Sequence, residues 1–140
     1  MNVSKVGSIL SLIGAIIIIV MACFGLLIGL ILGDLIPDPG VDAVINSALP
    51  FFYIYLTLGI IGLVIAIISF KEGYNKIFAG LNIGINATIL IYTTIITVLN
   101  MPLIIETGVD IPIIAFASTF TIFLIASILG TIGGVLRLKS

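Results

Sequence analysis

The residues best suited to chemistry in the apolar part of this chain are amides and hydroxyls that recur between Ile77 and Ile105. On a helix with 100° per residue, they fall within about 60° of one another. These residues are Asn82, Asn86, Thr93, Thr97 and Asn100. Such a polar stripe can hydrogen-bond to neighbouring helices. It can also line a narrow path for water or a small solute, with Asn86 as the constriction.

Groups that drive proton transfer, ion coupling or metal binding are missing from the apolar stretches. The chain has no histidine and one cysteine, Cys23, and its charged residues lie outside four long charge-free intervals. Pumps, proton relays and voltage sensors use ionisable groups inside the membrane, and metal or haem sites use His, Cys or clustered carboxylates. The sequence therefore predicts no catalytic residue, no metal site and no cofactor, and we expect that the protein is not an enzyme.

Composition indicates an integral membrane protein. Hydrophobic residues make up 61% and charged residues 8% of the 140 residues, against roughly 45–50% and about 25% in soluble domains. Each charge-free interval exceeds the about 20 residues that cross a bilayer as a helix, and the period-2 alternation of a β-barrel is missing. We expect one all-α domain over residues 1–140, an antiparallel up-down-up-down bundle of four transmembrane helices. The predicted spans are 6–33, 43–70, 77–105 and 111–136.

The charges predict an orientation in the membrane. The basic residues lie at the two ends of the chain and in the second loop: Lys5, Lys71, Lys76, Arg137 and Lys139. The first and third loops carry only acids: Asp34, Asp38, Asp42, Glu106 and Asp110. Because Lys and Arg are retained on the cytoplasmic side, we expect a multi-pass protein of the cell membrane with both termini cytoplasmic and a basic inner rim.

Small residues recur at helical spacing in three of the spans. The candidate helix-packing positions are Gly25, Gly29 and Gly33, then Gly59, Gly62 and Ala66, then Gly130 and Gly134. Lipid offers no hydrophobic gain from helix association, so small residues act by letting helix backbones approach closely. These faces are predicted to pack against helices of the same chain or of another subunit.

The two acidic loops each contain Gly-Val-Asp directly before a span. Asp42 and Asp110 are predicted to be N-caps of the second and fourth helices, where a carboxylate accepts backbone N–H bonds and meets the positive end of the helix dipole. A cation site built from Asp34, Asp38 and Asp42 is the alternative for the first loop. Capping already accounts for Asp42, so we do not expect a metal there.

Two stretches of the chain match at an offset of 71 residues. Lys5 aligns with Lys76, and the segment Leu58 to Val64 aligns with Leu129 to Val135. Each half would then be a two-helix hairpin, and the two halves would be related by an axis along the membrane normal. The sequence thus leaves open a 2+2 internal repeat.

The Lys-x-Gly-x-Ile-Leu start at Lys5 to Leu10 and the Gly-rich end at Gly130 to Val135 resemble a known group of proteins. These are the small, Ile/Gly-rich four-span membrane proteins of unknown function from archaea and bacteria. The resemblance implies a four-helix membrane fold across the chain. It transfers no catalytic or binding residues.

Together these features predict a non-catalytic membrane protein, either a structural or accessory subunit of a larger membrane complex or a homo-oligomer. The expected partners are the lipid bilayer and other transmembrane subunits or copies of the chain, not nucleic acid. The alternative is a channel or transporter component for a small solute, lined by Asn82, Asn86, Thr93 and Thr97. A membrane-embedded regulator that binds a partner's helices would have the same sequence features.

Overall fold

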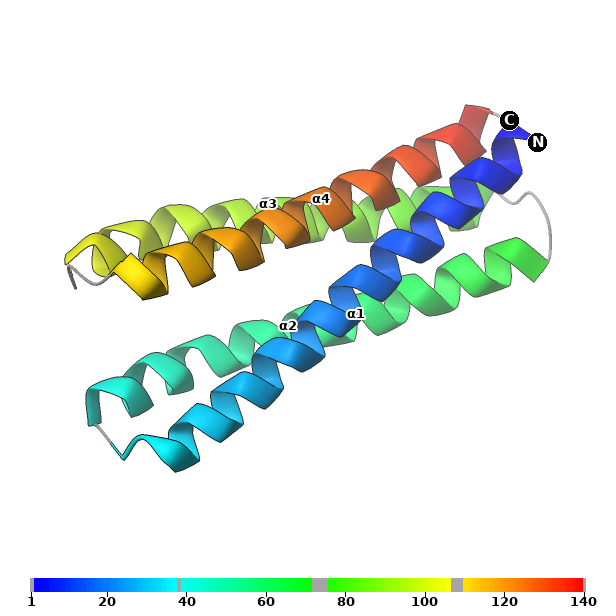
Figure 1. The fold of residues 1–140 in the computed structure, drawn as a ribbon. Helices are drawn as coiled ribbons and strands as arrows, with labels where there is room; N and C mark the ends of the chain where they lie inside the picture. Colours follow the sequence, from blue (N-terminus) through cyan, green and yellow to red (C-terminus); the bar gives the residue numbers. More distant parts are fainter. Residues whose placement is uncertain (1, 38, 72–75, 107–109, 140) are drawn as a thin grey trace.

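The computed structural model describes residues 2–37, 39–71, 76–106 and 110–139. The side chains at positions 41, 43, 44, 71, 100–106 and 110–117 lie outside the described part. The described residues form four long helices and no strand, as the sequence predicts (Figure 1). The helices are α1 (Val3–Leu35), α2 (Pro39–Lys71), α3 (Lys76–Glu106) and α4 (Asp110–Lys139).

Each helix contains a segment that is long and apolar enough to cross a bilayer. The segments are Val3–Leu35, Ile45–Phe70, Lys76–Leu99 and Ser118–Lys139. Every predicted span lies inside one helix, and every helix continues past both ends of its predicted span. The extra turns carry charged residues. A helix can continue past the hydrocarbon into the headgroup layer because its backbone remains hydrogen-bonded internally.

Helix α1 crosses the bundle diagonally and changes partner halfway along (Figure 1). Gly7 and Gly14, in its first half, lie against α4, whereas Gly25 and Gly29 lie against α2. Helices α3 and α4 also pack extensively on each other, while α2 and α3 touch over a much shorter stretch. In each of these pairs, the residues in contact run in opposite order along the two helices.

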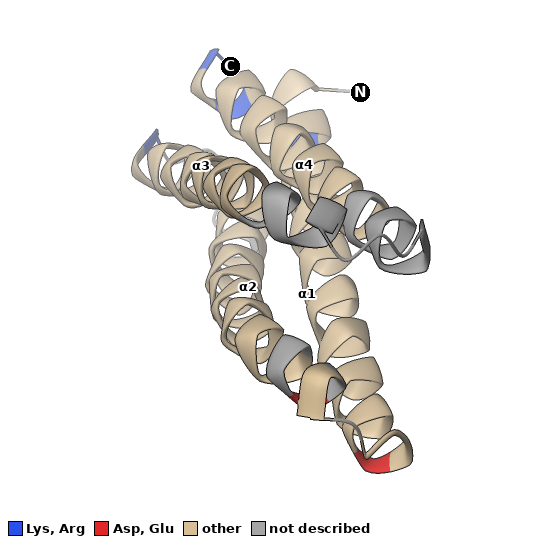
Figure 2. Cartoon of the chain, turned by 90° about the vertical axis from the view of Figure 1, so that its left-hand side faces the viewer, with Lys and Arg blue, Asp and Glu red and all other residues tan. Residues whose placement is uncertain are grey.

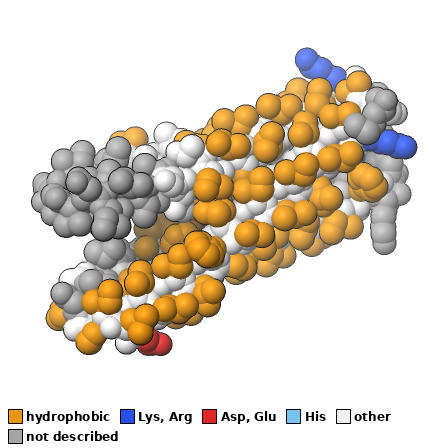
Figure 3. All heavy atoms as spheres, viewed as in Figure 1, with side chains coloured by type: hydrophobic (Ala, Val, Ile, Leu, Met, Phe, Trp, Pro, Cys, Tyr) orange, Lys and Arg blue, Asp and Glu red, His pale blue; other side chains and the backbone are white. Residues whose placement is uncertain are grey.

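The apolar core lies where all four helices meet. Its buried residues are Ile18, Ala22, Tyr55, Ile89, Phe123 and Ala126. The ring of Tyr55 stacks on Phe123, with centroids 4.1 Å apart and planes 10° apart, and meets Tyr92 edge-on at 5.6 Å. Outside this core, hydrophobic side chains cover much of the surface of the helices, as Figure 3 shows for one face. Such a surface suits the hydrocarbon of a bilayer.

The helix ends correct one predicted cap. Helix α2 begins at Pro39, a residue favoured at the first helical position because its missing N–H is not needed there. Asp42 therefore lies inside the first turn and is not the N-cap, although an acidic residue in that turn still benefits from the helix dipole. Asp110 is the first residue of α4, and its side chain lies outside the described part.

At α1, Asn2 is the N-cap, and its side chain accepts a hydrogen bond from the Ser4 backbone N–H at 3.2 Å. In the first loop, Asp34 and Asp42 are both exposed, and Asp38 lies outside the described residues. Within the described residues, no three His, Cys, Asp or Glu side chains come together.

The charges separate to opposite ends of the bundle (Figure 2). The beginning of α1 lies beside the end of α4, which places Lys5 and Lys139 at one end, and Lys76 begins α3 at the same end. Asp34 and Asp42 lie at the other end, where α1 is followed by α2. The described helices thus have one basic end and one acidic end.

Candidate functional site

The polar stripe of α3 faces the interior of the bundle. Asn82 is 1% exposed, Asn86 4% and Thr93 0%. Thr97 is half-buried, and the side chain of Asn100 lies outside the described part. The stripe therefore supplies three of the buried polar side chains of the bundle. Two further buried residues contact it, Ser11 of α1 and Tyr55 of α2. We call Ser11, Asn82, Asn86, Thr93 and Tyr55 the polar column.

Asn82 joins three helices. Its Nδ2 donates to Ser11 Oγ of α1 at 2.7 Å and to the Gly130 carbonyl of α4 at 3.0 Å. An amide NH₂ has two hydrogens to donate, so both donors are used. Ser11 is 1% exposed and was not among the candidate residues. The signal for Ser11 was its place on a small-residue face of the first span.

Asn86 extends the column by one helical turn. Its Nδ2 donates to the Asn82 carbonyl at 2.8 Å and to Asn82 Oδ1 at 3.2 Å. Its amide group lies over Gly130, where a Cβ atom would collide with it. Gly130 therefore leaves room for a polar side chain of α3.

Thr93 and Tyr55 link α3 to α2. Tyr55 Oη and Thr93 Oγ1 are 2.7 Å apart. Thr93 Oγ1 donates to the Ile89 carbonyl at 2.7 Å, so the hydroxyl hydrogen between the two helices comes from Tyr55. Thr97 Oγ1 donates to the Thr93 carbonyl at 2.8 Å, within its own helix. Tyr55 was not a candidate residue because tyrosines of membrane helices are usually interfacial, whereas it lies in the middle of α2 and is buried.

The chemistry available to the polar column follows from its groups. Amides and hydroxyls stay neutral at physiological pH, and in this bundle they donate to acceptors on neighbouring helices or on their own helix. Buried hydrogen bonds of this kind set the rotation of each helix and its choice of partner. The column is thus suited to holding α1, α2, α3 and α4 in one arrangement.

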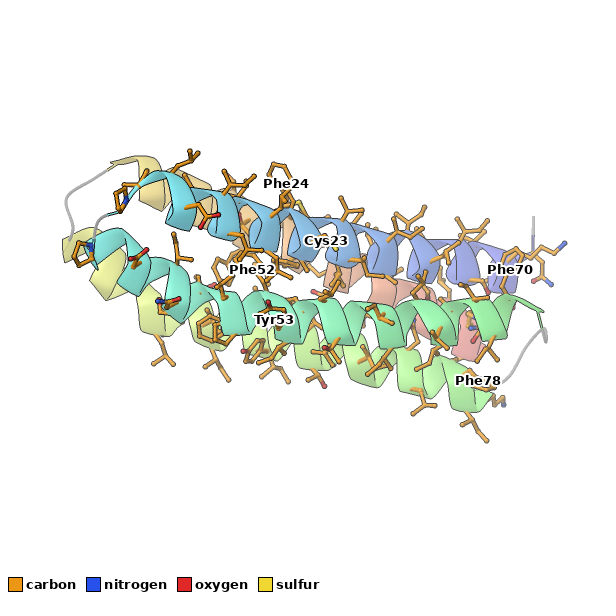
Figure 4. The ribbon with its side chains drawn as sticks, turned by 90° about the horizontal axis from the view of Figure 1, so that it is seen from below. Cys23, Phe24, Phe52, Tyr53, Phe70 and Phe78 are labelled. Atoms are coloured by element: carbon orange, nitrogen blue, oxygen red, sulfur yellow. The ribbon has the colours of Figure 1, made fainter. Side chains whose placement is uncertain are left out.

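The Gly-rich face of α1 works differently from the prediction. Gly25 lies against the ring of Phe52, which points toward α1 in Figure 4. A Cβ on Gly29 would lie 3.2 Å from Leu49 Cδ2, and at Gly33 the nearest atom is 3.8 Å away, in Ile45. These glycines receive large side chains of α2, because the two helices are too far apart here for their backbones to touch.

The closest backbone approach is between α1 and α4, at glycines that include two missed by the packing prediction. A Cβ on Gly7 would lie 2.5 Å from the Gly133 carbonyl oxygen, and one on Gly14 would lie 2.6 Å from the Ala126 carbonyl oxygen. Gly7 and Gly14 are about two helical turns apart, and Ser11 lies between them on the same face. This spacing in the sequence was the feature from which a packing face at Gly7 and Gly14 could have been predicted.

The remaining packing positions divide between tight and ordinary contacts. Gly59 is tight, because a Cβ there would lie 2.9 Å from Ile19 Cγ1, and Gly134 is tight against Ile83. Gly62 has its nearest atom at 3.8 Å, in Ile85. Ala66 is 1% exposed.

Arg137 lies at the basic end of the bundle, in the last turn of α4, but its side chain is fully buried. Its exposed fraction is 0%, and Nη2 donates to the Ser69 carbonyl of α2 at 3.3 Å. Ser69 lies in the last turn of α2, whose carbonyls have no partner within the helix. A cation at this end of a helix also complements its dipole. Arg137 of α4 thus caps α2, and it can cross to α2 because α1 has no side chain at Gly7.

Replacing Asn82 with leucine is expected to lower the free energy of unfolding by about 1–3 kcal/mol, since buried interhelical hydrogen bonds in membrane proteins contribute about 0.6–1.7 kcal/mol each. The measurement is SDS-induced unfolding in mixed micelles, followed by tyrosine near-UV circular dichroism. The matched control is Thr94→Leu, because Thr94 is exposed on the same helix and donates only to the Leu90 carbonyl. Equal losses for the two variants would contradict the role of Asn82.

Comparisons of this chain with protein families, with curated proteins and with solved structures give no match.

Proposed function

We propose that this chain is a non-catalytic, multi-pass protein of the cell membrane that acts as a structural or accessory subunit of a larger membrane complex, or assembles with copies of itself. The carrying observation is where the polar groups lie. Asn82, Asn86 and Thr93 are turned inward and bonded within the chain. The outward faces of the same helix carry mainly aliphatic side chains, as at Ile77, which is 71% exposed, together with the exposed Thr88 and Thr94, which bond to carbonyls of their own helix.

That distribution favours a role in assembly. Transmembrane helices associate through van der Waals packing, because lipid tails are as apolar as the side chains that they contact. A bundle whose internal hydrogen bonds already fix its shape presents a preformed apolar surface to a neighbouring subunit. Preorganisation of this kind lowers the entropic cost of association.

The charge distribution supports the proposed orientation. Lys5, Lys76 and Lys139 are exposed at one end of the bundle, and Asp34 and Asp42 at the other (Figure 2). With the basic end cytoplasmic, the four helices would cross the bilayer up-down-up-down and both ends of the chain would be cytoplasmic. The opposite order of contacts in paired helices supports this topology.

The proposal includes the 2+2 internal repeat, and one hydrogen bond supports it. Ser11 and Asn82 are 71 residues apart, the offset at which the two halves align, and they are hydrogen-bonded to each other at 2.7 Å. Equivalent residues of two related hairpins meet in this way when they lie beside the axis that relates the hairpins. The α1–α4 contact is nevertheless much more extensive than its counterpart α2–α3, so any such symmetry is approximate.

The channel alternative requires the stripe on α3 to face water. Asn86, the expected constriction, is 4% exposed and lies over Gly130 of α4, and Thr93 is covered by Tyr55 of α2. These contacts favour the packing role over a lining role.

The test is the native mass of the complex after extraction in a mild detergent and, in parallel, directly in polymer-bounded lipid discs. We expect either stoichiometric co-purifying membrane subunits or a closed oligomer of this chain, in both preparations. Identification of every co-purifying chain by mass spectrometry separates the two. A single chain without partners in both preparations would overturn the proposal.

A further inference from the structure

The basic end of the bundle carries three lysines that the fold leaves exposed. They are Lys5 near the start of α1, Lys76 at the start of α3 and Lys139 at the end of α4. The described carboxylate side chains, those of Asp34 and Asp42, are exposed at the opposite end (Figure 2). Within the described residues, the acidic side chains therefore lie at the end of the bundle away from these lysines.

Arg137, another cation of this end, has a different task. It is 0% exposed and bonded to the Ser69 carbonyl, so it faces the interior of the bundle. Its contact over Gly7 holds the end of α4 against the start of α1. Lys5, two residues before Gly7, and Lys139, two residues after Arg137, lie about 200° around their helices from these contact residues and point away from the α1–α4 contact.

A bundle placed across a bilayer has these lysines near the edge of the hydrocarbon. Each is next to the end of a helix segment that is apolar enough to span the bilayer. A lysine at that position extends its ammonium group into the headgroup layer while its aliphatic stem stays along apolar surface. The charges therefore lie at the depth of lipid phosphates.

We propose that Lys5, Lys76 and Lys139 form a binding surface for anionic phospholipid headgroups at the basic end of the bundle. Charge complementarity carries this assignment: a set of exposed cations at phosphate depth, with the described acids at the far end. A lysine near an anionic membrane surface contributes an affinity gain of about fivefold. The inference requires the transmembrane placement but not the accessory role, so either proposal can fail without the other.

The test uses the full chain purified in nanodiscs that contain equal amounts of phosphatidylglycerol and phosphatidylcholine. The lipids that stay bound after release into detergent are counted by native mass spectrometry. We expect phosphatidylglycerol to be enriched several-fold over phosphatidylcholine, and the enrichment to fall when salt is raised, because salt screens exposed charges.

The decisive variant is the triple substitution Lys5→Gln, Lys76→Gln and Lys139→Gln, which should reduce the enrichment to near one. The matched control, Asp34→Asn with Asp42→Asn, changes exposed charges at the other end and should retain it. All five side chains are exposed, so the fold should persist, and helix content measured by circular dichroism checks this. Equal binding of the two lipids by the unmodified protein, or unchanged enrichment in the triple variant, would overturn the proposal.

Discussion

Substituting alanine for Gly133 is expected to lower the free energy of unfolding by about 1–3 kcal/mol, the usual cost of adding atoms to a packed interior. The new Cβ would lie 2.5 Å from the Gly7 carbonyl oxygen and 2.8 Å from the Ser11 backbone nitrogen. Both are backbone atoms, so relief requires α1 and α4 to move apart. That movement would also lengthen the hydrogen bond from Asn82 to Ser11. The decrease in the free energy of unfolding is measured by SDS-induced unfolding.

The matched control is Gly84→Ala on α3. Gly84 is exposed, and a Cβ there would have no atom within 4 Å. In a helix, Gly→Ala removes backbone freedom from the unfolded chain, which favours the folded state by up to about 1 kcal/mol. We therefore expect Gly84→Ala to be neutral or stabilising. If Gly133→Ala were equally well tolerated, α1 and α4 would not be in backbone contact.

Substituting alanine for Arg137 is expected to cost about 2–4 kcal/mol of stability. The variant loses a charge-assisted hydrogen bond to the Ser69 carbonyl, a class of bond that contributes about 1.5–3 kcal/mol. It also leaves a cavity over Gly7, where the Arg137 stem packs. The loss of this hydrogen bond should be visible in amide hydrogen exchange. The backbone amides at the end of α2 should exchange faster in the variant than in the unmodified protein.

Two further variants separate charge from packing. Lys139→Ala removes an exposed cation two residues along the same helix and should leave stability within about 0.5 kcal/mol. Arg137→Met keeps much of the volume without the donors, and should recover stability relative to Arg137→Ala while the end of α2 still exchanges quickly. Equal stability of Arg137→Ala and Lys139→Ala would show that Arg137 does not cap α2.

Much of the helical architecture follows from the sequence alone. In a bilayer every backbone N–H and C=O must be bonded within its own segment, so long charge-free runs become helices wherever they occur. The predicted spans 6–33 and 77–105 lie inside α1 and α3 for this reason. The face of α3 that carries Asn82 and Asn86 was also predictable, since it depends only on helical spacing.

Only the tertiary structure determined which small residues contact the backbone of a neighbouring helix and which contact one of its side chains. Nearly every face of these helices is apolar, so hydropathy does not specify how each helix is rotated or which neighbour it meets. Gly7 approaches the Gly133 carbonyl and Gly25 receives Phe52, although both glycines lie on the same apolar helix. The diagonal course of α1 creates that difference, and it depends on contacts between residues distant in the chain.

The same reasoning applies to the charged residues. The sequence determined that the charges lie at the ends of the spans, because charged groups are excluded from the hydrocarbon. It did not determine that Arg137 turns inward to Ser69 while Lys139 stays exposed. That choice requires the last turn of α2 within reach of Arg137 and a glycine on α1 that leaves room, and only the packing of three helices supplies both.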